Sequence, residues 1–190
     1  MIPAKYSNQP YYPAVKFTVV FISLFLLFYY FNIGFFGLTS PGRHYIPFLA
    51  RHVNYIHWLR RGLLSSSAAL LNRLGFATIF DEYHLLVAGR GSIQLVYSCL
   101  GLGVMSFFAA FVLAYPKHGN LKYWFLAIGL VVIQLLNIAR FVLLALYWRG
   151  HTHQIADHHT IFNLIIYVLV TISLYFWVKS SAPTAPVNEN

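Results

Sequence analysis

Residues 17–36 read FTVVFISLFLLFYYFNIGFF and contain no charged side chain. Three further uncharged stretches follow, at residues 93–115, 123–139 and 160–178. Each is at or near the length of about 20 residues that an α-helix needs to cross a bilayer. The chain is 59% hydrophobic and 9% charged, whereas a soluble domain is about 45–50% apolar and about 25% charged. The sequence therefore predicts an all-α polytopic membrane protein, and it excludes a cytosolic enzyme, a nucleic-acid-binding domain and a disulfide scaffold.

The whole hydrophobic region is expected to form a single integral membrane domain over residues 1–180, followed by a polar, disordered tail at 181–190. The expected transmembrane spans lie at about 17–38, 97–115, 121–147 and 160–178. The first apolar run is longer than the 7–15 residues of a signal-peptide core, and no small-x-small cleavage site follows it. We therefore interpret the first run as an uncleaved anchor.

The charged residues sort by type between the two faces of this arrangement. With four spans and both termini on one side, all five lysines lie on that side and seven of the eight arginines lie on the other. The positive-inside rule weighs short loops near the ends of spans and discounts segments of about 60 residues or more. The usable signal comes from the N-terminal flank and the loop at 116–122, and it predicts that both termini are cytoplasmic.

The segment at 39–96 is then an outer-face segment with structure of its own. From Tyr45 to Phe76, apolar residues recur at helical spacing among arginines and histidines, which predicts one or two amphipathic helices. Two apolar runs around Gly89-Arg90-Gly91 predict a small β-hairpin between Tyr83 and Tyr97. The Arg-rich residues 43–73 suit either an anionic lipid or the tail of a substrate, and the net charge of +9 is assigned to loops that face water and headgroups.

Cys99 is the only cysteine, so it cannot form an internal disulfide. It follows the expected hairpin and opens the second span. Thiolates are favoured at helix N-termini and beside cations, which makes Cys99 a candidate nucleophile. The alternative is that a lone cysteine in an apolar helix is inert packing.

Arg140 lies late in the third span, with Asn137 and Gln134 at successive i−3 positions on the same face. If the hydrocarbon begins near Tyr123, a rise of about 1.5 Å per residue places Arg140 about 25 Å across the bilayer, close to the outer boundary. A guanidinium that snorkels to the headgroups is one interpretation. The amide neighbours favour a functional site, because charges inside membranes commonly mark one.

His158 and His159 open the fourth span, and Asn163 lies four residues beyond His159 on the same helix face. One interpretation is an acid/base, because histidine titrates near neutral pH. Another is a set of polar side chains at headgroup level. A third is a zinc site, although no His-Glu-x-x-His pattern is present. The residues of that zinc site would be His151, His153, Asp157 and His158.

The expected topology places Cys99, Arg140 and His159 at the same membrane face on three consecutive helices. A nucleophile, a cation and a titratable base at one depth are the groups that acyl transfer needs.

In their order and spacing, these motifs resemble the exosortase/archaeosortase family of membrane cysteine transpeptidases. The family pattern is Cys-Ser-Gly at the start of a span, Asn-x-x-Arg late in the next, and His-x-x-x-Gly at the start of the last. The corresponding segments here are Ser98-Cys99-Leu100-Gly101, Asn137-Ile138-Ala139-Arg140 and His159-Thr160-Ile161-Phe162-Asn163. The resemblance covers roughly residues 83–178, and Leu100 and Asn163 replace the usual serine and glycine, as in a divergent, short member.

The resemblance implies a protease or transpeptidase of the cytoplasmic (inner) membrane that works at the outer, periplasmic face through a thioester acyl-enzyme. It implies the catalytic set Cys99, Arg140 and His159. The supporting residues would be Asn137, Gln134, Asn163 and His158. His158 is also the alternative catalytic histidine, because an acidic residue precedes it, as in some family members.

The implied partners are secreted precursor proteins that carry a C-terminal sorting signal and a transmembrane helix, together with membrane lipids. No nucleic acid, cofactor or metal is implied. Two alternatives stay open. One is a zinc-dependent intramembrane hydrolase that uses the loop histidines, and the other is a small, non-enzymatic assembly subunit whose polar residues join helices.

Overall fold

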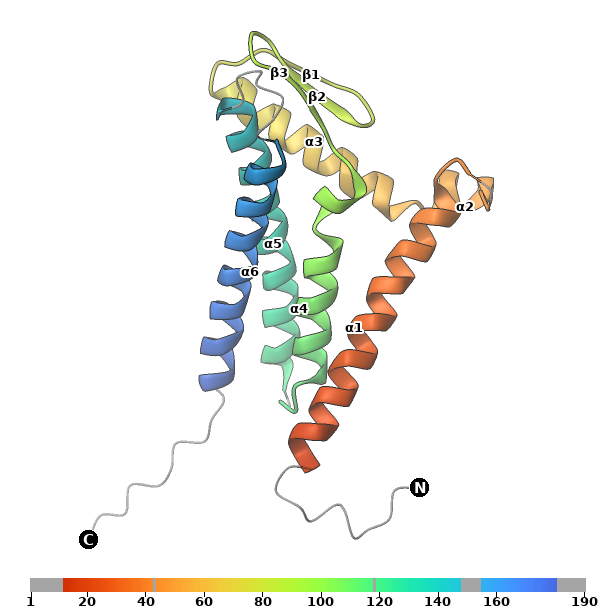
Figure 1. Cartoon of the computed structure of the whole chain (residues 1–190), viewed down its shortest axis with the longest axis vertical. Helices are drawn as coiled ribbons and strands as arrows, with labels where there is room; N and C mark the ends of the chain where they lie inside the picture. Colours follow the sequence, from red (N-terminus) through yellow and green to blue (C-terminus); the bar gives the residue numbers. More distant parts are fainter. Residues whose placement is uncertain (1–11, 43, 118, 148–154, 181–190) are drawn as a thin grey trace, which may run out of the picture. The chain divides into compact units, whose positions relative to one another are not determined.

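A computed structural model of the chain describes residues 12–42, 44–117, 119–147 and 155–180, with the backbone alone for 155–161. The chain divides into two compact units, residues 1–152 and 153–190. The first unit contains helices α1 to α5 and a small sheet, and the second contains α6 (Ile155–Lys179). Figure 1 shows the order of these elements along the chain.

Three helices of the described residues are long and apolar enough to cross a membrane. They are α1 (Tyr12–Thr39), α5 (Asn120–Tyr147) and α6, the last over Phe162–Lys179. They correspond to the expected spans at 17–38, 121–147 and 160–178, and the protein is a multi-pass membrane protein.

The remaining expected span, 97–115, is not confirmed, because this segment is not one continuous helix. It consists of a short 3₁₀ helix, η2 (Tyr97–Leu100), followed by α4 (Leu102–Ala114). Gly101 separates them in the left-handed conformation, with φ at 73°. The 13 residues of α4 rise about 20 Å, which is less than the bilayer core of about 30 Å.

Aromatic side chains pack α1 against α4. The rings of Phe17 and Phe111 meet edge to face at 5.3 Å between centroids, and those of Phe21 and Phe107 at 5.4 Å. Such edge-to-face pairs add to the energy of burial. They join the N-terminal part of α1 to the middle and end of α4, where the two helices approach each other (Figure 1).

Gly129 lets α4 and α5 approach closely. A Cβ atom at this position would lie 2.2 Å from the Cζ atom of the Phe108 ring, and Phe108 is fully buried. Small residues at such contacts are typical of helix packing in membranes, where close van der Waals contact drives association.

We expect Gly129→Ala to destabilise the protein by about 1–3 kcal/mol, because the added methyl group overpacks the contact with Phe108. Gly34→Ala is the matched control, since Gly34 is also helical and nothing lies within 4 Å of its position. Thermal unfolding in detergent measures both. Equal midpoints for the two variants would contradict the role of Gly129 in helix packing.

Residues 40–96, hereafter the cap, connect α1 to η2. They contain two helices, α2 (Pro47–His52) and α3 (Tyr55–Arg73), where one or two amphipathic helices are expected. Asn54 caps α3, because its Oδ1 accepts the backbone N–H of His57 at 3.0 Å. The apolar stripe of α3 is buried, as its spacing predicts; it comprises Ile56, Leu63, Leu64, Ala68 and Leu71.

The predicted hairpin is confirmed, with β2 (His84–Val87) paired antiparallel to β3 (Gly91–Gln94). A third strand, β1 (Thr78–Phe80), pairs with β2 on the other edge and was not predicted. It has only three residues, all at least partly exposed. The segment therefore lacks the alternation of apolar and polar residues by which a strand is recognised in a sequence.

A polar chain ties the cap to the helices below it. The hydroxyl of Tyr55 on α3 donates to Asn32 Oδ1 on α1 at 2.5 Å, and Asn32 Nδ2 donates to Ser106 Oγ on α4 at 3.1 Å. Burial raises the pKa of Tyr55 to about 12.

Candidate active site

Cys99 lies in η2, between the sheet of the cap and α4, three residues before α4 begins. Its side chain is buried, with 3% of its surface exposed. The neighbouring core is apolar and includes Leu85, Leu95 and Phe141. The expected position of Cys99 near the start of an apolar helix is therefore confirmed, but the cysteine itself belongs to the 3₁₀ turn.

Arg140 lies on α5 and is buried, with 2% of its surface exposed. The burial excludes the interpretation in which its guanidinium snorkels out to the headgroups. A side-chain hydrogen bond and a Coulombic interaction join Arg140 to Cys99. The Cζ atom of Arg140 also lies 5.4 Å from the centroid of the Phe141 ring. The structure therefore brings together two of the three candidate residues.

Gln134 and Asn137 hold the turn that contains Cys99. The side-chain amides of both donate to the carbonyl oxygen of Leu100, at 3.2 Å from Gln134 Nε2 and 3.4 Å from Asn137 Nδ2. Asn137 Nδ2 also lies 3.3 Å from Gln134 Oε1, and Gln134 Nε2 lies 2.6 Å from the sulfur of Met105. Two residues of the polar stripe predicted on α5 therefore bind the backbone carbonyl of Leu100, which follows Cys99. The spacing of residues along α5 does not by itself indicate this contact.

Gly101 is required at its position for two reasons. Its φ of 73° is a conformation that side chains rarely adopt, and it allows η2 to end and α4 to begin. A Cβ atom there would also come within 2.3 Å of Asn137 Nδ2. Gly101 therefore shapes the backbone of the candidate site, next to Cys99 and Asn137.

We expect Gly101→Ala to destabilise the protein more than Gly89→Ala. Gly89 has a similar φ of 74° but open space around it, so its variant bears only the backbone cost of about 1–2 kcal/mol. The Gly101 variant should lose at least about 1 kcal/mol more, because Asn137 has to move. Thermal unfolding of the two variants measures the difference, and equal losses would contradict the contact with Asn137.

The candidate histidines lie in the second unit. His158 and His159 belong to the first turns of α6, so they open the last helix as predicted, although α6 begins at Ile155, earlier than expected. Their side chains lie outside the described residues. Asn163 is partly buried on the same helix.

The proposed zinc site also falls outside the described residues, because His151 and His153 and the side chains of Asp157 and His158 are not among them. Within the described ranges, no group of three or more His, Cys, Asp or Glu side chains is arranged to hold a metal ion.

Comparison with known proteins gives one result. A family model described as transmembrane exosortase matches residues 14–176, from the first turn of α1 to the last turn of α6. Nothing matches among the curated proteins or the solved structures. The matched region is longer than the part of the chain that carries the cysteine, arginine and histidine motifs.

Proposed function

The chain belongs to the transmembrane exosortase family, whose members are membrane cysteine transpeptidases and proteases, and from this premise we propose that Cys99 is the nucleophile that cleaves the sorting signal of precursor proteins. The substrates are secreted precursors with a C-terminal sorting signal and a transmembrane helix. The observation that carries the proposal is the contact between Cys99 and Arg140. It joins the cysteine motif and the arginine motif in one buried site.

The reaction proceeds through a thioester. The Cys99 thiolate attacks the scissile peptide carbonyl, and a C–S bond forms as the carbonyl oxygen takes the negative charge. The tetrahedral intermediate then collapses, the C–N bond breaks and the amine leaves with a proton. Water or an amine acceptor attacks the thioester, which releases the product and returns the thiol.

Arg140 acts on the charge that develops in these steps. A fixed guanidinium beside the sulfur favours the thiolate over the thiol, and the same group stabilises the oxyanion of the intermediate. Burial strengthens the attraction between the guanidinium and a negative charge, because few water molecules screen it. Gln134 and Asn137 act indirectly, since they hold the turn of Cys99 through the carbonyl of Leu100.

A histidine completes the mechanism as the acid and base. His159 protonates the leaving amine and later takes a proton from the acceptor. His159 is preferred to His158 because it shares a helix face with Asn163, four residues further on. The reaction takes place at the outer face of the cytoplasmic membrane, and both termini are cytoplasmic.

We expect His159→Ala to slow processing about 10²–10⁴-fold, the usual contribution of general acid–base catalysis, whereas His158→Ala should retain most activity. Intact-mass measurement of the protein after incubation with a precursor provides a second readout. An adduct trapped on Cys99 should be removed by hydroxylamine, as a thioester is, and the His159 variant should form this adduct more slowly. A reversed pattern would assign the role to His158, and no effect of either variant would contradict a histidine acid/base.

A further inference from the structure

A cavity of about 430 Å³ opens in the cap, where the end of α1 meets α2 and the first turns of α3. It lies in the first unit and contains no residue of the proposed active site. Its charged and polar lining includes Arg51, Asn54, His57, Arg60, Arg61 and Glu82. We refer to it as the cap cavity.

Three arginines and one carboxylate, that of Glu82, line the cap cavity, so the charge of its described lining is positive. The carboxylates described are those of Asp81 and Glu82, and each pairs with a histidine. Glu82 Oε1 lies 3.3 Å from His57 Nδ1, and Asp81 Oδ2 lies 3.2 Å from His84 Nδ1. Among the described residues, the three arginines of the cavity therefore form no ion pair.

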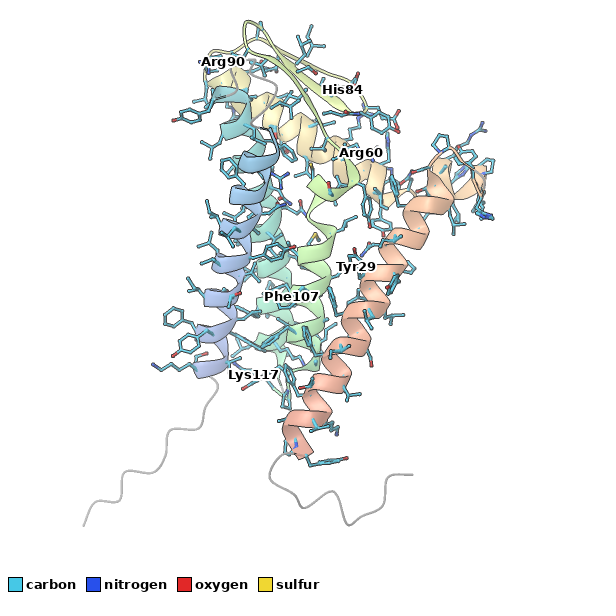
Figure 2. The ribbon with its side chains drawn as sticks, viewed as in Figure 1. Tyr29, Arg60, His84, Arg90, Phe107 and Lys117 are labelled. Atoms are coloured by element: carbon cyan, nitrogen blue, oxygen red, sulfur yellow. The ribbon has the colours of Figure 1, made fainter. Side chains whose placement is uncertain are left out.

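Arg60 is the central cation of this group. Only 5% of its surface is exposed, and its Cζ atom lies 4.4 Å from the centroid of the Tyr83 ring. Within the described ranges its Nε has no hydrogen-bond partner. Burying a charged group without a partner of opposite charge is costly, and an anion in the cavity would supply that partner. Figure 2 shows Arg60 in its place in the cap.

The N-terminus of α3 adds to the attraction for an anion. Asn54 and His57, in the capping turn of this 19-residue helix, line the cavity, and the first turn contains no acidic residue. The free amide groups and the dipole at a helix N-terminus favour negative charge.

The depth and rim of the cap cavity indicate what kind of anion fits. Thr39, the last residue of the membrane-spanning α1, lines the cavity, which places it at the level of lipid headgroups. Tyr45 and Trp58 also line it, with 41% and 59% of their surfaces exposed, and Phe48 on the adjoining α2 is 66% exposed. Tyrosine and tryptophan are typical of the membrane–water interface. A soluble anion would make no use of this apolar rim, whereas a lipid has a charged head and apolar tails.

We propose that the cap cavity binds the phosphate group of an anionic glycerophospholipid at the membrane surface, with Arg60 as its central contact and Arg51 and Arg61 at its mouth. The acyl chains lie along the exposed aromatic side chains of the cap. This site is independent of the proposed catalytic function, because it lies among different residues.

The test is thermal unfolding of the delipidated full chain in neutral detergent, with added phosphatidylglycerol or with phosphatidylcholine of the same acyl chains. Phosphatidylglycerol should raise the unfolding midpoint saturably, and phosphatidylcholine should not. Arg60→Gln should weaken the apparent affinity for phosphatidylglycerol about fivefold or more, the usual effect of one basic residue at a membrane surface. Arg73→Gln is the matched control, since Arg73 is an exposed arginine at the other end of α3 and does not line the cavity.

Several outcomes would overturn the proposal. They are equal shifts with the two lipids, equal losses in the Arg60 and Arg73 variants, an equal shift with inorganic phosphate alone, or displacement of the lipid by an acidic peptide. If Arg60→Gln does not fold, the double variant Arg51→Gln/Arg61→Gln decides. Both of these side chains are exposed, and their loss should weaken the binding of phosphatidylglycerol by a similar factor or more.

Discussion

Replacing Cys99 with serine should slow cleavage of a precursor's sorting signal about 10³-fold or more. The serine hydroxyl is a much weaker nucleophile than a thiolate, and the buried site offers Arg140 to stabilise a negative sulfur. Pulse–chase labelling of an epitope-tagged precursor in cells that express each variant measures the rate at which the precursor loses its membrane anchor. The full chain is used, and its amount in the membrane is measured alongside.

Ser98→Ala is the control for this experiment, because Ser98 belongs to the same turn and its side chain is exposed. Its rate should stay within about twofold of the unmodified protein, as expected for a surface substitution away from any special contact. Processing that continues unchanged in the Cys99 variant would exclude cysteine catalysis. Near-stoichiometric zinc in the purified protein would then be expected, because the loop histidines would have to provide the chemistry.

The long helices and the cap could be predicted from local sequence patterns alone. Uncharged runs of bilayer length predicted α1, α5 and α6. The helical spacing of apolar residues predicted the helical segment of α2 and α3, and Gly89-Arg90-Gly91 predicted the hairpin. These features follow from periodicity and composition, so a sequence without its structure already contains them. The strand β1 could not be predicted in this way, because it forms by pairing with β2 and has no sequence pattern of its own.

The candidate site shows the same division. The helical spacing of Gln134, Asn137 and Arg140 predicted one polar stripe on α5, and the structure places the first two side chains on the carbonyl of Leu100. That contact could not be predicted, because it depends on the break at Gly101, where the chain changes direction. The expected topology placed Cys99 and Arg140 at the same membrane face, and the structure adds the side-chain hydrogen bond between them. The role of His159 stays a prediction.

Arg140→Gln should slow processing about 10²–10³-fold, which is the typical loss when one group that stabilises an oxyanion is removed. Because Arg140 contacts Cys99 directly, the same variant should also lower the rate at which iodoacetamide alkylates Cys99 at a fixed neutral pH. Cys99 is the only cysteine in the chain, so the alkylated mass reports this one residue without further substitutions. Slower processing together with slower alkylation would locate the effect at the sulfur.

Arg140→Lys separates catalysis from helix packing. Lysine keeps the positive charge but lacks the planar, multi-donor guanidinium, so it cannot reach the sulfur and an oxyanion in the same geometry. We expect this variant to restore much of the unfolding midpoint lost in Arg140→Gln while it restores little of the processing rate. If Arg140 has only a structural role, any buried cation would hold the helices together. Arg140→Lys would then restore the processing rate together with the unfolding midpoint. Alkylation and processing that are normal in both variants would contradict the pairing and would support a non-enzymatic assembly subunit.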